Sequence, residues 1–213
     1  MPDKTPTALE SILDYHHISM RIEFDGANKK ERVFSACLPG MKVPGPRMGG
    51  SAFVFAHATT PATAVSALAK ALQGRTLQSD DESKRVEFPD DLDAASLVRK
   101  LEPGTEVERL AVNYVADVAV RMVVPFSLTR EAYDDLWVAT MGASMLQTES
   151  KGQLLVPIST ENEKPLLAIK DIAWQLDGKL LCRREMEFHA PVLPNVRHTL
   201  QEEIRAGKKP SKE

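Results

Sequence analysis

The chain has 213 residues, of which 43% are hydrophobic and 27% charged, and its formal net charge is −3. These are the values of an ordinary globular protein, and a charge this small excludes strong general attraction to nucleic acid or to an anionic membrane. No apolar run approaches the roughly 20 residues that span a bilayer, and the first ten residues lack the apolar segment of a secretory signal. We therefore expect a cytoplasmic protein.

The first part of the chain predicts a flexible leader over residues 1–12 and then a hairpin. Apolar and polar residues alternate over residues 18–24, and this period of two is typical of a half-buried strand. Asp25 and Gly26 favour a turn, after which residues 32–38 can return as the partner strand.

A helix is predicted after a Pro/Gly-rich loop over residues 39–50 and a short strand over residues 52–56. Thr60 followed by Pro61 combines a capping hydroxyl with the residue that best tolerates the first helical position. Gly74 is placed to end this helix.

The middle of the chain predicts mainly strands. Residues 85–88 favour a strand, and residues 93–101 a short helical turn. The apolar residues within 107–114 and 118–126 favour two more strands, joined by a tight connection at residues 116–117.

A capped helix is then expected from Thr129, which would follow the second of these strands directly. Leu128 could pack on Tyr133 as a hydrophobic staple. Tyr133, Trp137 and Met141 would share one helical face.

The last third predicts further strands at residues 166–169 and 172–176, a hairpin at Asp177-Gly178, and a return over residues 180–188. A helix over residues 196–204 would close the fold. The whole pattern predicts an α+β protein with two packed subdomains that meet near residue 126.

Catalytic and metal-binding patterns are not found in the sequence. His16 and His17 are adjacent, so on a strand they would point to opposite faces, and the other three histidines are isolated. Cys37 and Cys182 form no CxxC pair, and no serine lies in a nucleophile motif. We therefore predict a protein that is not an enzyme and has no metal or cofactor.

Three anchors resemble the appendage (ear) domain of clathrin-adaptor large chains, the adaptins. These anchors are the turn Leu101-Glu102-Pro103-Gly104, the strand end Val124-Pro125-Phe126, and the helical pair Tyr133 and Trp137. The resemblance covers roughly residues 98–205. It implies a β-sandwich-like subdomain over residues 13–126, a smaller platform subdomain of antiparallel strands with flanking helices over residues 127–205, and a basic tail over residues 206–213.

The same resemblance implies a function. Adaptin appendages recruit accessory and coat proteins through short peptide motifs, so this chain would belong to a vesicle-coat adaptor complex and reach membranes only indirectly. The peptide-binding groove would contain Tyr133 and Trp137, with Arg183 as its charged neighbour. An exposed tryptophan could take an apolar side chain of the peptide, and a guanidinium could take an acidic one.

Two alternatives stay open. One is a small-molecule-binding or enzymatic α+β domain, with a pocket between the loop at residues 39–50 and His57. The other is a structural subunit whose exposed sheet edge pairs with a larger partner. Exposure of Trp137 beside Arg183 would favour the peptide-binding module over the small-molecule or enzymatic domain, and a deep enclosed pocket near His57 would favour the latter.

Overall fold

Strand β1 (Met20–Asp25) lies at the centre of an eight-stranded antiparallel sheet. The structure is a computed structural model, and it describes residues 7–25, 33–44, 52–142, 147–148, 158–183 and 186–193. One neighbour is β2 (Phe34–Val43), so the predicted hairpin is confirmed. The other neighbour is β6 (Pro125–Arg130), from the second half of the chain.

The sheet runs in the order β5-β4-β2-β1-β6-β7-β9, with β3 on the free side of β2. A smaller sheet has the order β11-β10-β8. The remaining strands are β3 (Ala52–Ala58), β4 (Thr76–Ser79), β5 (Arg85–Glu87), β7 (Trp137–Met141), β8 (Gln147–Thr148), β9 (Ile158–Asn162), β10 (Leu180–Arg183) and β11 (Met186–His189).

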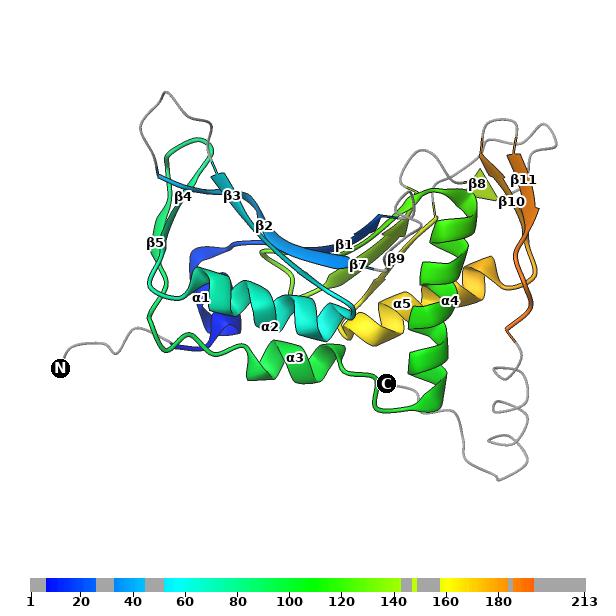
Figure 1. Cartoon of the computed structure of the whole chain (residues 1–213), viewed down its shortest axis with the longest axis horizontal. Coiled ribbons are helices and arrows are strands. Elements are labelled where there is room, and N and C mark those ends of the chain that lie inside the picture. The colour runs from blue at the N-terminus through cyan, green and yellow to red at the C-terminus, as the bar shows by residue number, and fades with distance from the viewer. Residues whose placement is uncertain are drawn as a thin grey trace.

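Five helices complete the described fold: α1 (Leu9–His16), α2 (Pro61–Leu72), α3 (Ala95–Leu101), α4 (Glu106–Met122) and α5 (Pro165–Leu176). The predicted α+β class is confirmed. Helices cover the lower face of the large sheet in Figure 1, while its upper face carries none of the described helices and lies between the β4–β5 and β10–β11 hairpins. One apolar core runs through both halves of the chain.

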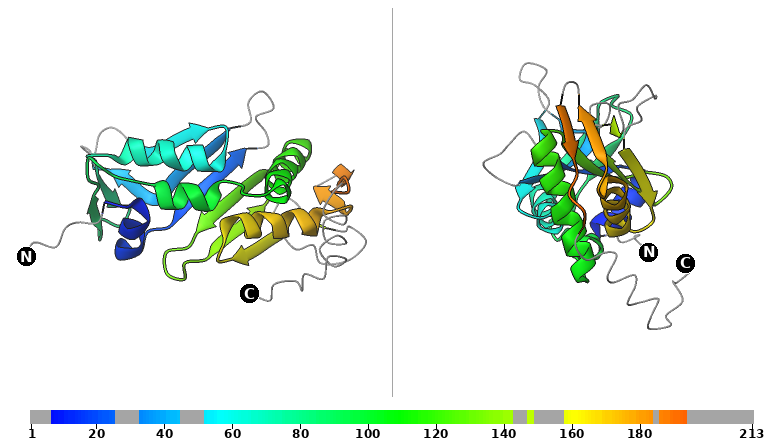
Figure 2. Two further views of the ribbon diagram at one scale, coloured as in Figure 1. Left: turned by 90° about the horizontal axis from the view of Figure 1, so that it is seen from below. Right: turned by 90° about the vertical axis from the view of Figure 1, so that its right-hand side faces the viewer.

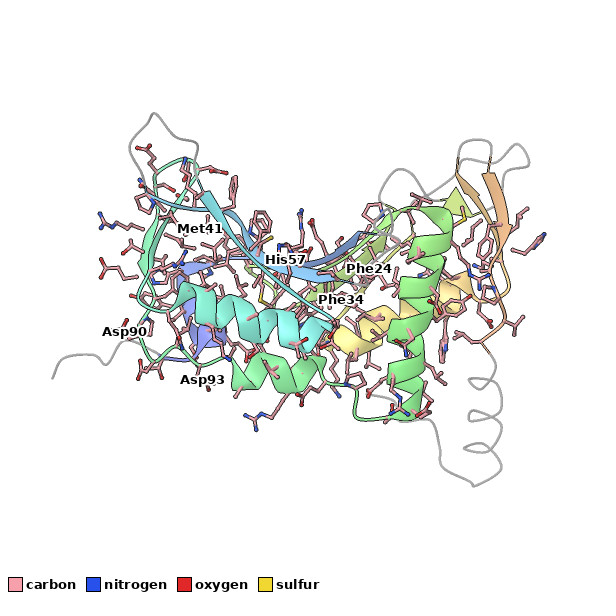
Figure 3. The ribbon with its side chains drawn as sticks, in the orientation of Figure 1. Phe24, Phe34, Met41, His57, Asp90 and Asp93 are labelled. Carbon is pink, nitrogen blue, oxygen red and sulfur yellow. The ribbon has the colours of Figure 1, made fainter. Side chains whose placement is uncertain are left out.

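Cross-strand packing in this core is illustrated by Phe24 and Phe34, which lie directly opposite each other on β1 and β2. Their ring centroids are 5.0 Å apart and both side chains are buried (Figure 3). The sheet crosses from one half of the chain to the other at β1 and β6. The predicted subdomain boundary after residue 126 therefore falls inside β6, a central strand.

The two halves have the same plan. The sequence α1-β1-β2-β3-α2 is followed by the hairpin β4–β5, and α4-β6-β7-β9-α5 is followed by the hairpin β10–β11. The order β3-β2-β1-β6-β7-β9 within the large sheet is accordingly palindromic about the β1–β6 joint, as expected for two copies of one unit related by an approximate twofold axis. The hairpins differ, because β4–β5 extends the large sheet whereas β10–β11 belongs to the smaller one.

Helices α2 and α5 show this repeat residue by residue. Both have 12 residues, begin with proline, and are followed by a glycine with positive φ, 65° at Gly74 and 66° at Gly178. Their buried positions coincide at a constant offset of 104 residues: Pro61, Ala62, Ala64, Val65, Leu68, Ala69 and Leu72 in α2, and Pro165, Leu166, Ala168, Ile169, Ile172, Ala173 and Leu176 in α5.

The prediction for α2 is confirmed in detail, because Thr60 caps this helix and its hydroxyl oxygen accepts a hydrogen bond from the Thr63 amide at 3.2 Å. The predictions for α5 were wrong. Residues 166–169 and 172–176 belong to one helix, and Asp177-Gly178 ends that helix instead of forming a hairpin.

The two strands predicted within residues 107–126 are also wrong, because residues 106–122 form α4. A reciprocal capping box begins this helix: the Thr105 hydroxyl accepts from the Glu108 amide at 3.2 Å, and the Glu108 carboxylate accepts from the Thr105 amide at 3.0 Å. Buried Ala111, Val115 and Val118 recur every three or four residues, which is the spacing of one helical face.

The helix predicted from Thr129 is absent as well. Thr129 lies within β6, and the chain returns through residues 131–136 to β7. Burial alternates along both strands, with Leu128 and Arg130 buried on β6 and Trp137 and Ala139 buried on β7. This period of two suits a hairpin and does not suit a helix.

At the N-terminus, the predicted flexible leader over residues 1–12 is wrong for its last four residues. Residues 9–12 lie in α1, with Leu9 and Ile12 fully buried. The predicted closing helix at residues 196–204 and the basic tail at residues 206–213 lie outside the described residues. Among the described helices, none has both the length and the apolar composition needed to cross a membrane.

Candidate binding face

The strand register defines which side chains lie on the helix-free face of the large sheet, called here the open face. Residues directly opposite each other in an antiparallel sheet project to the same side. One row across six strands therefore contains Phe55, Cys37, Arg21, Thr129, Val138 and Glu161. A second row contains His57, Ser35, Glu23, Ser127, Thr140 and Ser159.

Between these rows lies a third one, which faces the helices. Its members are Ala56, Ala36, Ile22, Leu128, Ala139 and Thr160, and all of them are buried. The alternation separates a mainly apolar inner face, which also holds the buried Arg130 and Thr160, from a mainly polar open face, in which hydroxyl side chains predominate on β6, β7 and β9.

Two adjoining grooves occupy the open face. The first has a volume of about 490 Å³ and lies between the start of β1, the β4–β5 turn and the β6–β7 loop. The second, of about 570 Å³, continues along β1, β6 and β7. Arg21, Thr129 and Glu131 line both grooves, so the two grooves adjoin at these residues and together are called the channel here.

Stacked aromatic rings form one wall of the first groove. The rings of His17 and Tyr133 are 5.0 Å apart and inclined by 20°, and Tyr133 keeps 76% of its surface exposed. The Lys84 ammonium donates to the backbone carbonyls of His16 and His17, each at 3.2 Å, and so holds the turn that presents His17. This wall is thus tied to the β4–β5 turn on the other side of the groove.

That β4–β5 turn provides a permanent negative charge. The Asp81 carboxylate accepts hydrogen bonds from the Ser79 hydroxyl at 2.5 Å and from the Ser83 hydroxyl and amide at 2.8 and 3.1 Å. These bonds lower the pKa of Asp81 to about 2. Arg21 and Glu23 form an ion pair of 3.4 Å on the groove floor, so the open face offers charges of both signs.

Cys37 is not suited to nucleophilic chemistry. Burial raises the pKa of its thiol to about 11, and the neighbouring Glu23 carboxylate adds to the rise, while Arg21 opposes it. The thiolate is the reactive form, so at neutral pH this cysteine stays protonated.

Ser35 and His57 form a pair that sequence spacing did not indicate, since they are 22 residues apart. The Ser35 hydroxyl and His57 Nδ1 are 2.7 Å apart, because the β2–β3 register places these residues opposite each other. A serine nucleophile also needs a group that orients its histidine, and among the described residues no carboxylate bonds to the His57 ring. The pair therefore provides hydrogen-bonding groups on the open face and no complete triad.

The residues predicted to form a peptide-binding groove do not come together. Trp137 is fully buried at the start of β7, on the helix side of the sheet. Arg183 lies on β10 in the small sheet. Tyr133 stacks on His17, which directly follows α1. Because α1 and β10 lie at opposite ends of the fold, Arg183 and Tyr133 are far apart (Figure 1). Of the three residues, only Tyr133 lines the channel.

The alternative pocket between the loop at residues 39–50 and His57 is found in part. Pro39, Gly40 and Met41 line the first groove, but His57 is not among its lining residues. Residues 45–50 lie outside the described part of the chain.

Within the described ranges, no three His, Cys, Asp or Glu side chains gather in a way that could hold a metal ion. The acidic residues Asp90 and Asp93 lie on the helix side of the sheet, away from the open face (Figure 3). Comparison of the chain with models of protein families, with curated proteins and with solved structures finds no match.

Proposed function

We propose that this protein is a non-enzymatic binding module that holds an extended segment of a partner protein in the channel on its open face. The observation that carries the proposal is that the two grooves adjoin at Arg21, Thr129 and Glu131, on a sheet face that none of the described helices covers. An extended chain rises about 3.3 Å per residue, so the length of β1, with six residues, matches a peptide of about six residues.

The chemistry of the channel suits a polypeptide. Ser127, Thr129 and Thr140 present hydroxyl groups that can bond to peptide amides and carbonyls. Arg21 can pair with an acidic side chain, and Glu131 with a basic one. The exposed ring of Tyr133 offers the apolar contact that anchors many interfaces.

A catalytic role has less support. The Cys37 thiol is held protonated, and the Ser35–His57 pair has no orienting carboxylate among the described residues. Binding therefore accounts for the geometry better than catalysis.

The resemblance to adaptin appendages supports the same class of function, because those domains bind short peptide motifs. Their groove cannot be carried over residue by residue, since residues 106–122 form a helix here and Trp137 is buried. Membership of a vesicle-coat complex and a cytoplasmic location remain predictions of the sequence.

A peptide selection tests the proposal. Peptides displayed on phage are selected against the wild-type protein, and the affinities of the recovered peptides are measured by fluorescence polarisation for the wild type, Arg21→Ala and Tyr133→Ala. We expect each substitution to weaken binding about tenfold or more, on the scale of lost hot-spot contacts.

Tyr15→Ala is the matched control, because Tyr15 on α1 is also 76% exposed but does not line either groove. This variant should bind like the wild type. Two results would overturn the proposal. In the first, no peptide is recovered; in the second, all recovered peptides bind Arg21→Ala and Tyr133→Ala as tightly as they bind the wild type.

A further inference from the structure

Strand β3 forms one edge of the large sheet, and among the described residues it pairs with β2 alone. Its sequence, AFVFAHA, contains no Asp, Glu, Lys, Arg or Pro. Phe53 and Phe55 are 46% and 50% exposed, and their ring centroids are 6.3 Å apart. Edge strands of proteins that stay monomeric are usually blunted by charge, proline or a covering element, and β3 has no charge or proline of its own.

The fold itself does not require such an edge. Strand β9 occupies the equivalent edge in the second half of the chain, and its sequence is ISTEN. The positions on its open face are the polar residues Ser159 and Glu161, where β3 has Phe55 and His57. The apolar character is thus specific to the β3 edge.

We propose that β3 pairs with β3 of a second copy of this chain, antiparallel and about a twofold axis at Phe55. This register places Phe55 opposite its own copy, Phe53 opposite His57, and Val54 opposite Ala56. It keeps the aromatic residues on the open face and the small apolar residues on the helix face, as the pleat requires. No position brings like charges together, so a second copy is a complementary occupant of this edge.

Helix α2 supports the same partner. It packs beside β3 beneath the sheet (Figure 2), so the twofold axis would bring α2 next to its own copy. The residues of α2 that are not buried are Thr63, Ser66, Ala67, Lys70 and Ala71, and four of these five have small side chains. Small side chains allow two helices to approach to the usual packing distance of about 8–10 Å.

The chain already contains one joint of this kind. Strands β1 and β6 pair antiparallel across the approximate twofold axis that relates the two halves. A β3–β3 joint would extend the same sheet into the second copy and would place two open faces side by side.

Sedimentation equilibrium and light scattering test the proposal. For the wild-type chain of 23.5 kDa we expect the mass of a dimer. Phe55→Lys and Phe55→Glu should each be monomeric, because each places two like charges opposite each other, and an equimolar mixture of the two should again be dimeric. Glu161→Lys on β9 is the control and should leave the dimer intact.

Disulfide cross-linking provides a second test, which remains valid even if the charged variants at position 55 do not fold. Under mild oxidation Phe55→Cys should form an intermolecular disulfide, because opposite residues at the axis lie about 4.5–5.5 Å apart, whereas Tyr15→Cys should not. Both variants also carry Cys37→Ala and Cys182→Ala, because Cys37 lies directly opposite position 55 on β2 and would compete for the new thiol. A monomeric wild type, a Phe55→Lys variant that remains dimeric, or equal cross-linking of both cysteine variants would each overturn the proposal.

Discussion

His17 and Val123 have the same left-handed backbone conformation, with φ of 50° and 54°, although they are 106 residues apart. Each follows the last residue of a helix and leads into a central strand of the sheet. The accompanying hydrogen bonds also agree: the Ile18 amide donates to the Leu13 carbonyl at 2.9 Å, and the Val124 amide donates to the Ala119 carbonyl at 3.0 Å.

This agreement extends the repeat from α2 and α5 to the start of each half. The offset is 106 residues here and 104 at α2 and α5, so the net difference in chain length between these points is two residues. Individual elements differ more, since α4 has 17 residues against 8 in α1, and β2 has 10 against 5 in β7. The open face accordingly consists of strands from two similar halves of the chain, and the side chains differ between the two halves.

Val123→Gly should stabilise the protein by about 1 kcal/mol. The left-handed region strains a β-branched residue but not glycine, and the relief outweighs the added freedom of the unfolded chain. Chemical denaturation measures the effect. Val123→Ala retains the strained backbone, and a gain in stability equal to that of glycine would show that backbone strain is not the cause.

Trp137→Ala should destabilise the protein by about 3–5 kcal/mol, because it empties a fully buried site on the helix side of β7. The peptide-binding groove expected from the sequence would instead have an exposed Trp137, and replacing an exposed residue usually changes the free energy of unfolding by less than about 1 kcal/mol. Thermal and urea denaturation would decide between the two. A loss below about 1 kcal/mol would contradict the burial of this side chain.

Cys37 should make the folded state less stable at alkaline pH. Its pKa is about 11 in the folded protein against an ordinary value of 9.0, so the unfolded chain loses the proton first. The contribution of the protonated Cys37 thiol to the free energy of unfolding is complete below about pH 9 and disappears as the pH rises towards 11. Urea denaturation at about pH 8 and about pH 10 should show a loss of stability that is smaller in Cys37→Ala, and equal losses would contradict this reasoning.

Ser35 should not react with a fluorophosphonate probe, because the His57 beside it has no orienting carboxylate among the described residues. Intact-protein mass spectrometry measures the modification. Labelling of the wild type that disappears in both Ser35→Ala and His57→Ala would show that the pair acts as a nucleophile and its base, and would favour the enzymatic alternative.

The parts of the fold that follow local rules could be predicted from the sequence. The hairpin of β1 and β2 showed its period of two, and α2 carried a threonine cap, a proline at its first position and a terminal glycine. Each signal lies within a few residues of the structure that it specifies.

The errors arose where local signals were ambiguous. Helix α4 is rich in valine and alanine, and valine is common in strands, so residue type favoured strands there. The recurrence of apolar residues every three or four positions was the better indication of a helix. Thr129 resembles a helix cap, but its place on β6 is decided by pairing with Arg21 and Val138. The channel could not be predicted, because it depends on the register of strands that are more than 100 residues apart.

The most direct test of the central claim is NMR mapping of the bound peptide. A peptide recovered by phage selection is titrated into the isotope-labelled protein, and amide shifts are followed. The account predicts that the largest shifts occur at open-face residues that line the channel, such as Arg21, Thr129 and Thr140. Shifts concentrated instead on the outer faces of α2 and α5, with the channel unchanged, would contradict it.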